Sequence, residues 1–149
     1  MRRRPLLALP LLAFAAAGRA ATLPAPVSLA DELSGALKAG RPLLVMASLD
    51  GCPYCRLVRD SFLAPLRVET GQPVVQLDMG RKDGVAGFDG ARSTHDELLR
   101  RWQVRVAPTV LFFGPGGREV AERLVGAAIP DFYGAYLQQR LEAARRAIR

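Results

Sequence analysis

The chain has 149 residues, which is enough for one ordinary domain and too few for two. Half of its residues are apolar, so it can bury a core without a structural metal ion or a set of disulfides. Its formal net charge of +7 does not indicate a nucleic-acid partner, because much of the basic excess lies in the first 20 residues.

Those first residues have the three-part layout of a secretory signal peptide. An arginine-rich start precedes an apolar run over 5–17, and small residues follow at Gly18 and Ala20. The run is shorter than the roughly 20 residues that a membrane span needs, and a retained anchor is the alternative. Cleavage after Ala20 removes four arginines and lowers the net charge to +3. We therefore predict a signal peptide over 1–20 and one periplasmic domain over 21–149.

The first half of this domain predicts alternating helix and strand. Ser28 can cap a helix that runs to about Ala39. The continuous apolar run 43–47 favours a central strand covered on both faces. Pro53 suits the first position of a second helix. We expect that helix to falter near Ala64-Pro65, because proline disfavours helical backbone in the residue before it.

The next segment predicts a strand, a loop and a helix. Residues 73–77 indicate a second strand with Val74 and Val75 at its centre. Residues 80–92 hold four glycines and several charges, which is typical of a loop. Ser93 is the expected cap of the next helix. Leu98, Leu99 and Trp102 are expected to face inward from it.

The C-terminal part predicts a hairpin and a long helix. Residues 109–113 and 119–125 flank a glycine-rich turn and can pair as antiparallel strands. The final helix starts at Asp131, and its expected inward residues are Phe132, Tyr136, Leu137, Leu141 and Ala144. The resulting order, a helix followed by β-α-β-α-β-β-α, predicts an α/β domain with a small mixed sheet of about four strands. Its first two strands run parallel with a right-handed crossover.

The only two cysteines form the motif Cys52-Pro53-Tyr54-Cys55 at the start of the second helix. A helix N-terminus offers unpaired N–H groups and a positive dipole end, and both favour a thiolate. We therefore expect Cys52 to be the exposed nucleophile of disulfide exchange. Cys55, one turn further, is expected to resolve the mixed disulfide.

Charged neighbours act on this pair in opposite directions. Asp50 disfavours a nearby thiolate, whereas Arg56 and Arg59 favour one.

These features together resemble the thioredoxin superfamily over residues 28–147. The resemblance rests on the element order, the Cys-x-x-Cys motif at a helix start and Val106-Ala107-Pro108-Thr109 before a strand. It implies a thioredoxin fold in which Pro108 is cis and lies against the cysteines. It also implies a substrate-binding surface that includes Pro53, Tyr54, Ala107 and Pro108.

Two departures separate the chain from thioredoxins proper. Gly51 stands where those proteins carry a tryptophan, and Met46 stands where they carry a buried acid. Met46 leaves Cys55 without its usual proton acceptor, so that water or another group has to serve. The Pro53-Tyr54 dipeptide is similar to that of glutaredoxins and some periplasmic Dsb-type proteins.

The resemblance implies a monomeric, exported thiol:disulfide oxidoreductase that uses no cofactor. Its partners would be protein thiols and disulfides, and we favour a reducing role supplied by a membrane thiol carrier. The alternative is a non-enzymatic carrier of copper or thiols on the same fold. An inert structural disulfide is a third interpretation, but a disulfide that closes so short a loop removes little conformational entropy from the unfolded chain and so stabilises the fold little. His95, the only histidine, is expected at the surface, and a closed zinc site needs four ligands.

Overall fold

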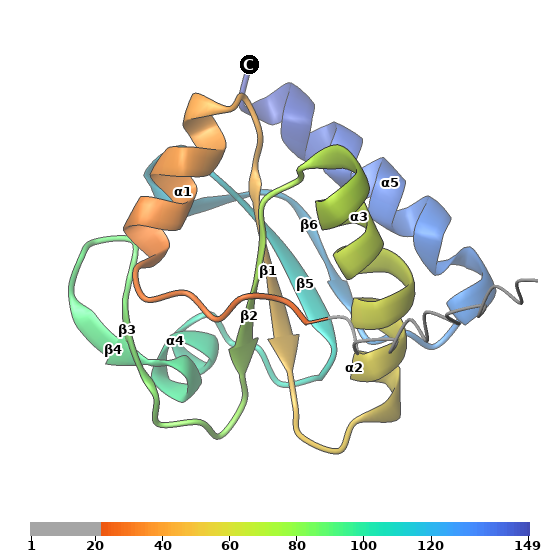
Figure 1. Cartoon of the computed structure of the whole chain (residues 1–149), viewed down its shortest axis with the longest axis horizontal. Coiled ribbons are helices and arrows are strands. Elements are labelled where there is room, and N and C mark those ends of the chain that lie inside the picture. The colour runs from red at the N-terminus through yellow and green to blue at the C-terminus, as the bar shows by residue number, and fades with distance from the viewer. Residues whose placement is uncertain (1–21) are drawn as a thin grey trace, which may run out of the picture.

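The computed structural model describes residues 22–149, so the predicted signal peptide lies outside the described residues (Figure 1). Its centre is a mixed four-stranded sheet in the order β2-β1-β5-β6. The strands are β1 (Leu43–Ser48), β2 (Val74–Asp78), β5 (Thr109–Gly114) and β6 (Arg118–Val125). β1 runs parallel to β2 and antiparallel to β5, and β5 and β6 form an antiparallel hairpin. The predicted mixed sheet is confirmed.

Helices cover both faces of this sheet (Figure 1). They are α1 (Leu29–Lys38), α2 (Pro53–Val58), α3 (Ala64–Thr70), α4 (His95–Arg101) and α5 (Pro130–Ala147). Buried side chains of α2, α3 and α5 pack in one cluster with the sheet, and those of α1 and α4 pack in a second cluster. The sheet is thus buried between two helical layers.

β1 is the strand that leads the chain to the cysteines. All six of its residues are buried, as expected for a strand covered on both faces. Successive side chains point to opposite faces. Leu44 and Met46 enter the cluster that contains α2, whereas Val45 and Ala47 enter the cluster that contains α1. The strand ends just before the loop that carries Cys52.

The predicted start of α1 is confirmed in detail. The Ser28 hydroxyl accepts a hydrogen bond from the Asp31 backbone N–H at 3.2 Å. The helix ends at Lys38, and Gly40 follows with a φ of 69°, a left-handed conformation that glycine adopts without strain.

The helix that begins at Pro53 becomes irregular just before Ala64-Pro65, as expected, but the chain remains helical through that point. A π-helical turn, η1 (Arg59–Leu63), joins α2 directly to α3, which continues to Thr70. Proline has no N–H for a helical hydrogen bond. The wider turn places Pro65 in the first turn of α3, where that missing donor is tolerated.

Residues 80–92 are not a plain loop. They contain β3 (Gly84–Ala86), which pairs antiparallel with β4 (Arg92–Thr94) in a separate two-stranded sheet. The connecting turn is closed by hydrogen bonds from Gly90 N–H to the Gly87 carbonyl at 3.0 Å and from Gly87 N–H to the Ala91 carbonyl at 2.9 Å. Two of the four glycines predicted as loop residues, Gly87 and Gly90, therefore lie in the turn of a hairpin.

Strand β4 also shifts the start of the next helix. The prediction that Ser93 caps α4 is wrong. β4 extends to Thr94, and the hydroxyl of this last strand residue is the cap, because it accepts the hydrogen bond from the Glu97 N–H. Leu98 and Leu99 are buried as expected, while Trp102 is partly buried against the same cluster.

The final helix α5 has nearly the predicted extent, but the set of residues that face the core differs from the prediction. Leu137, Leu141 and Ala144 are buried as predicted, but the residue that accompanies them is Tyr133. Phe132 and Tyr136 are 59% and 44% exposed, so the prediction that they face the core is wrong. Each lies one position away from a buried residue, about 100° around the helix.

Candidate redox site

The site is built around the N-terminus of α2, where Cys52 is the N-cap residue. Its backbone is extended, with φ −84° and ψ 111°, and its sulfur accepts a hydrogen bond from the Cys55 backbone N–H at 3.1 Å. Its carbonyl accepts the first helical bond from Arg56 N–H at 3.2 Å. Gly51 has a φ of 75°, which explains why the turn before the cysteine uses glycine.

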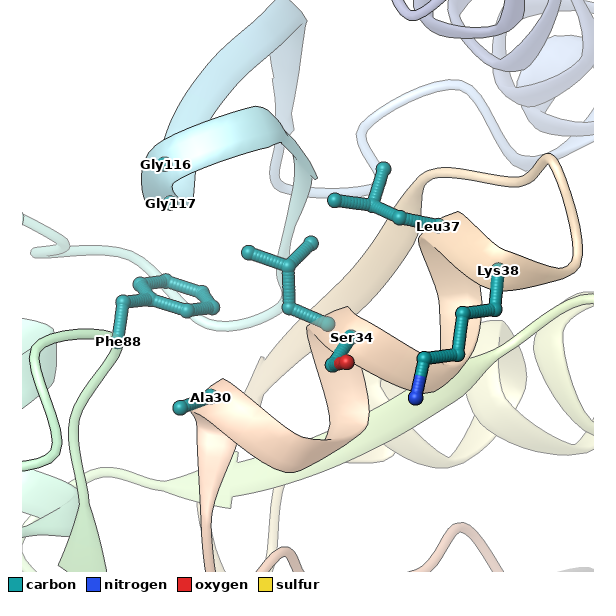
Figure 2. A pocket seen from close by; sticks show the side chains of 8 residues that line it. Ala30, Ser34, Leu37, Lys38, Phe88, Gly116 and Gly117 are labelled. Atoms are coloured by element: carbon teal, nitrogen blue, oxygen red, sulfur yellow. The ribbon is translucent and has the colours of Figure 1, made fainter.

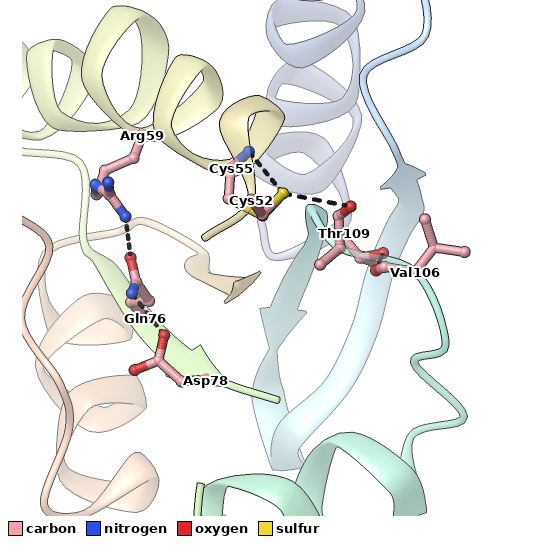
Figure 3. Close-up of a disulfide and its surroundings, with 8 residues drawn as sticks. Cys52, Cys55, Arg59, Gln76, Asp78, Val106 and Thr109 are labelled. Atoms are coloured by element: carbon pink, nitrogen blue, oxygen red, sulfur yellow. Dashed lines mark hydrogen bonds between the residues drawn. A yellow bond between two sulfur atoms is a disulfide. The ribbon is translucent and has the colours of Figure 1, made fainter. Parts of the chain in front are cut away.

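The two cysteines form a disulfide, with their Cα atoms 5.2 Å apart (Figure 3). Cys52 is partly exposed, whereas Cys55 is 1% exposed and belongs to the core cluster beneath α2. An incoming molecule can therefore approach the sulfur of Cys52 but is shielded from that of Cys55. This asymmetry matches the expected division between nucleophile and resolving residue.

The segment before β5 lies against the disulfide, as the family resemblance implies. The Ala107-Pro108 peptide bond is cis, and the Ala107 carbonyl oxygen is 3.9 Å from the Cys52 sulfur. Two hydrogen bonds hold this segment in place. The Gly126 N–H donates to the Pro108 carbonyl at 2.7 Å, and the Thr109 hydroxyl donates to the Val106 carbonyl at 2.6 Å.

The other predicted substrate-contacting residues face solvent. Pro53 is exposed, and the Tyr54 side chain is 56% exposed. Leu49 and Val106 are also exposed large apolar residues beside the site. Val106 belongs to the motif before β5, but the sequence did not indicate that its side chain or that of Leu49 would be exposed, because exposure of an apolar residue is not visible in a local pattern.

Met46, which stands where thioredoxins carry a buried acid, is itself fully buried. It packs in the cluster that includes Cys55. Three polar side chains lie in a row nearby: Arg59 on η1, and Gln76 and Asp78 on the neighbouring strand β2 (Figure 3). Arg59 Nη1 lies 3.5 Å from Gln76 Oε1, and Gln76 Nε2 donates to Asp78 Oδ1 at 2.8 Å. The sequence placed Arg59 near the cysteines but gave no sign of its partners on β2.

His95 is buried, so the expectation of a surface residue is wrong. Its Nδ1 accepts a hydrogen bond from the Asp78 backbone N–H at 3.2 Å, which ties α4 to the end of β2. Burial lowers the pKa of His95 below its ordinary 6.5, although the carboxylates of Asp78 and Asp83 act in the opposite direction. This histidine therefore serves as a neutral hydrogen-bond acceptor in the fold.

A cavity of about 560 Å³ lies away from the disulfide, between α1 and the turn that joins β5 to β6 (Figure 2). Its lining includes Leu33, Leu37 and Phe88, with Ser34 and Lys38 at its rim. Because α1 belongs to the opposite layer from α2, this cavity is not part of the cysteine site.

Residues 22–149 contain no group of three or more His, Cys, Asp or Glu side chains arranged to hold a metal ion. No helix in this part of the chain is both long and apolar enough to cross a membrane.

Comparison with known proteins agrees with this geometry. A family profile described as a thioredoxin-like domain matches residues 29–141. Thiol:disulfide interchange protein DsbD 1 of Pseudomonas aeruginosa is 30% identical over 125 residues, which cover 82% of this chain and 19% of that protein. The chain thus spans about a fifth of the length of this relative.

Two solved structures share the fold at lower identity. A thioredoxin-fold protein from Helicobacter pylori has a TM-score of 0.56 and 13% identity, covering 72% of this chain and 73% of that one. Fasciola hepatica thioredoxin has a TM-score of 0.53 and 19% identity, covering 80% of this chain and 97% of that one.

Proposed function

The chain belongs to the family of thioredoxin-like domains, and from this premise we propose that it catalyses thiol:disulfide exchange through Cys52 and Cys55. The observation that carries the proposal is the asymmetric disulfide at the start of α2. One sulfur is accessible at a helix N-terminus, and the other is buried one turn behind it.

The reaction starts from the dithiol form. The Cys52 thiolate attacks one sulfur of a partner disulfide, and the partner's other sulfur leaves as a thiolate that takes up a proton. Cys55 then loses its proton, and its thiolate attacks the Cys52 sulfur and releases the second partner thiolate. Two electrons have passed to the partner, and the protein is left with the disulfide seen in the structure.

The surface around Cys52 suits a protein partner. Tyr54 and Val106 are exposed apolar side chains, and the cis peptide at Pro108 presents the Ala107 carbonyl beside the sulfur. An extended segment of another protein could bury these apolar groups while placing its own disulfide next to Cys52.

Variants of the two cysteines test the proposal. Cys52→Ser is expected to abolish the acceleration of insulin reduction by dithiothreitol, because the accessible nucleophile is lost and Cys55 is buried. Cys55→Ser is expected to accumulate mixed disulfides, because nothing resolves them. Reduction by Cys52→Ser at the normal rate would overturn these roles. An inactive wild-type protein that binds copper tightly would favour the carrier function instead.

We further propose that the domain works in the periplasm as a reductant that receives electrons from a membrane thiol carrier. The relationship to DsbD 1, named a thiol:disulfide interchange protein, supports this proposal. N-terminal sequencing of protein from a cell fraction tests the location: a periplasmic protein beginning at Ala21 is expected, and a cytoplasmic protein beginning at Met1 would contradict it.

A further inference from the structure

Building on the proposed exchange reaction, we propose that Arg59 is a positioning residue for the resolving step. Its guanidinium group, held over β2 by Gln76, favours the thiolate of Cys55 where the chain has methionine instead of a buried acid. The role concerns the second half of the reaction, in which Cys55 must lose a proton before it attacks Cys52.

The helix brings Arg59 beside Cys55. The Arg59 backbone N–H donates to the Cys55 carbonyl, so the two residues lie one turn apart on the same face. That face turns toward the sheet, because Cys55 is buried in the cluster beneath α2. The Arg59 side chain is only 23% exposed, so water screens its charge less than that of a free surface arginine.

Gln76 and Asp78 fix the direction of this side chain (Figure 3). Gln76 pairs with Met46 across the parallel strands, so it lies next to the position of the missing acid. Its amide nitrogen donates to Asp78 at 2.8 Å, which leaves its amide oxygen to face Arg59 Nη1 at 3.5 Å. A side chain held in this way loses less conformational entropy when a thiolate forms nearby.

The charged groups around this position set the sign of the effect. Asp60 forms an ion pair with Arg59 at 3.1 Å, and its side chain is 36% exposed, more than that of Arg59. Asp78 on β2 is shared with Arg81 at 3.5 Å, and α5 contributes the buried Tyr133, whose hydroxyl is ordinarily neutral. Arg59 is therefore a cation in the layer of Cys55, partly offset by the more exposed Asp60.

The two chemical steps can be followed separately with an aromatic disulfide, 5,5′-dithiobis(2-nitrobenzoate). The reduced protein releases one coloured thiolate when Cys52 attacks and a second when Cys55 resolves the mixed disulfide. We expect Arg59→Gln to slow the second release by about three- to tenfold at pH 7, since a cation near a thiol shifts its ionisation by that order. The first release should change little.

Three further variants sharpen the test. Arg59→Lys keeps the charge and should recover most of the second rate, and Arg67→Gln removes a charge from the exposed side of α3 and should match wild type. Asp60→Asn removes the competing anion and should accelerate the second release. The Arg59→Gln deficit should vanish at high pH, where Cys55 ionises without help.

The outcomes separate this inference from the proposed function. A wild-type protein with no second release would contradict the exchange function itself. A normal second release in Arg59→Gln across the pH range would overturn the role of Arg59 and leave the exchange function intact. Equal slowing by Arg59→Gln and Asp60→Asn would show that their ion pair acts through structure, and the electrostatic role would be wrong.

Discussion

The N-termini of α2 and α4 use the same backbone arrangement in different ways. At α4 the Thr94 hydroxyl accepts a hydrogen bond from Glu97 N–H at 3.2 Å, and the Glu97 carboxylate accepts one from Thr94 N–H at 3.1 Å. Asp96 adds a second negative charge to that first turn. At α2 the capping atom is the Cys52 sulfur, and the first turn contains no acidic residue.

Under the proposed function, this difference separates a structural helix end from a reactive one. The capping box at α4 satisfies the free N–H groups and balances the helix dipole with carboxylates. At α2 the dipole faces a sulfur that can carry the negative charge itself, and Pro53 at the first position contributes no N–H. The same local electric field therefore stabilises the fold at α4 and favours a thiolate at α2.

Placing an acid in the first turn of α2 should make it resemble α4. We expect Tyr54→Asp to slow alkylation of reduced Cys52 by iodoacetamide by roughly tenfold near pH 7, because a carboxylate there opposes the thiolate. Tyr54→Asn is the neutral control of the same size and should react at nearly the wild-type rate. Equal rates in the two variants would show that the electric field at this helix end does not control Cys52.

Removing the cap of α4 should cost stability without affecting reactivity. Thr94→Ala is expected to lower the free energy of unfolding by about 1 kcal/mol, the usual cost of losing such a cap. Urea denaturation measures this change, and Thr94→Ser, which keeps the hydroxyl, is the control. A loss of disulfide exchange in Thr94→Ala would contradict the claim that the cap of α4 affects stability alone.

The N-terminus of α5 offers a third case, because Ile129 occupies the cap position with no side-chain hydrogen bond. Ile129→Ser supplies an acceptor for the first N–H groups and should raise the free energy of unfolding by about 0.5 kcal/mol. Ile129→Ala, which removes the same exposed side chain without adding an acceptor, is the control. A serine variant no more stable than the alanine variant would contradict the capping argument.

The smallest effect concerns His95, the first residue of α4. Its lowered pKa means that the unfolded chain binds a proton more readily than the folded protein. The contribution of His95 to the free energy of unfolding should therefore be fully present above pH 6.5. It should decrease as the pH falls from there through the lowered pKa of the folded protein. His95→Asn can still accept from Asp78 N–H but does not titrate, so thermal melts of this variant should lack that decrease.

The sequence predicts most of the fold because its signals there are local. Ser28 marks the start of α1, the apolar run at 43–47 marks β1, and Pro53 marks α2. The cysteine pair could be placed at a helix start for the same reason. The cis peptide before Thr109 followed from family resemblance and is confirmed.

The remaining features depend on contacts between distant segments. β3 pairs with β4 and also bridges from Ala86 to Ser28 near the start of α1, which no pattern within 80–92 reveals. The inward face of α5 is set by packing of Tyr133 on Phe62, with ring centres 5.1 Å apart.

The polar partners of the site depend on distant segments in the same way. His95 is buried because the end of β2 packs over it. The alignment of Arg59 with Gln76 requires β2 to lie beside the cysteine helix, which becomes apparent only when the chain is folded.

The proposed function requires Cys52 and Cys55 to interconvert reversibly between a disulfide and two thiols. Equilibration of the purified protein in glutathione buffers of graded ratio, followed by alkylation and mass measurement, tests this directly. We predict one two-electron transition in which both cysteines change together, at a potential nearer that of thioredoxin, about −270 mV, than that of a strong oxidant near −120 mV. A disulfide that does not respond to the buffer, or cysteines that titrate independently, would contradict the account.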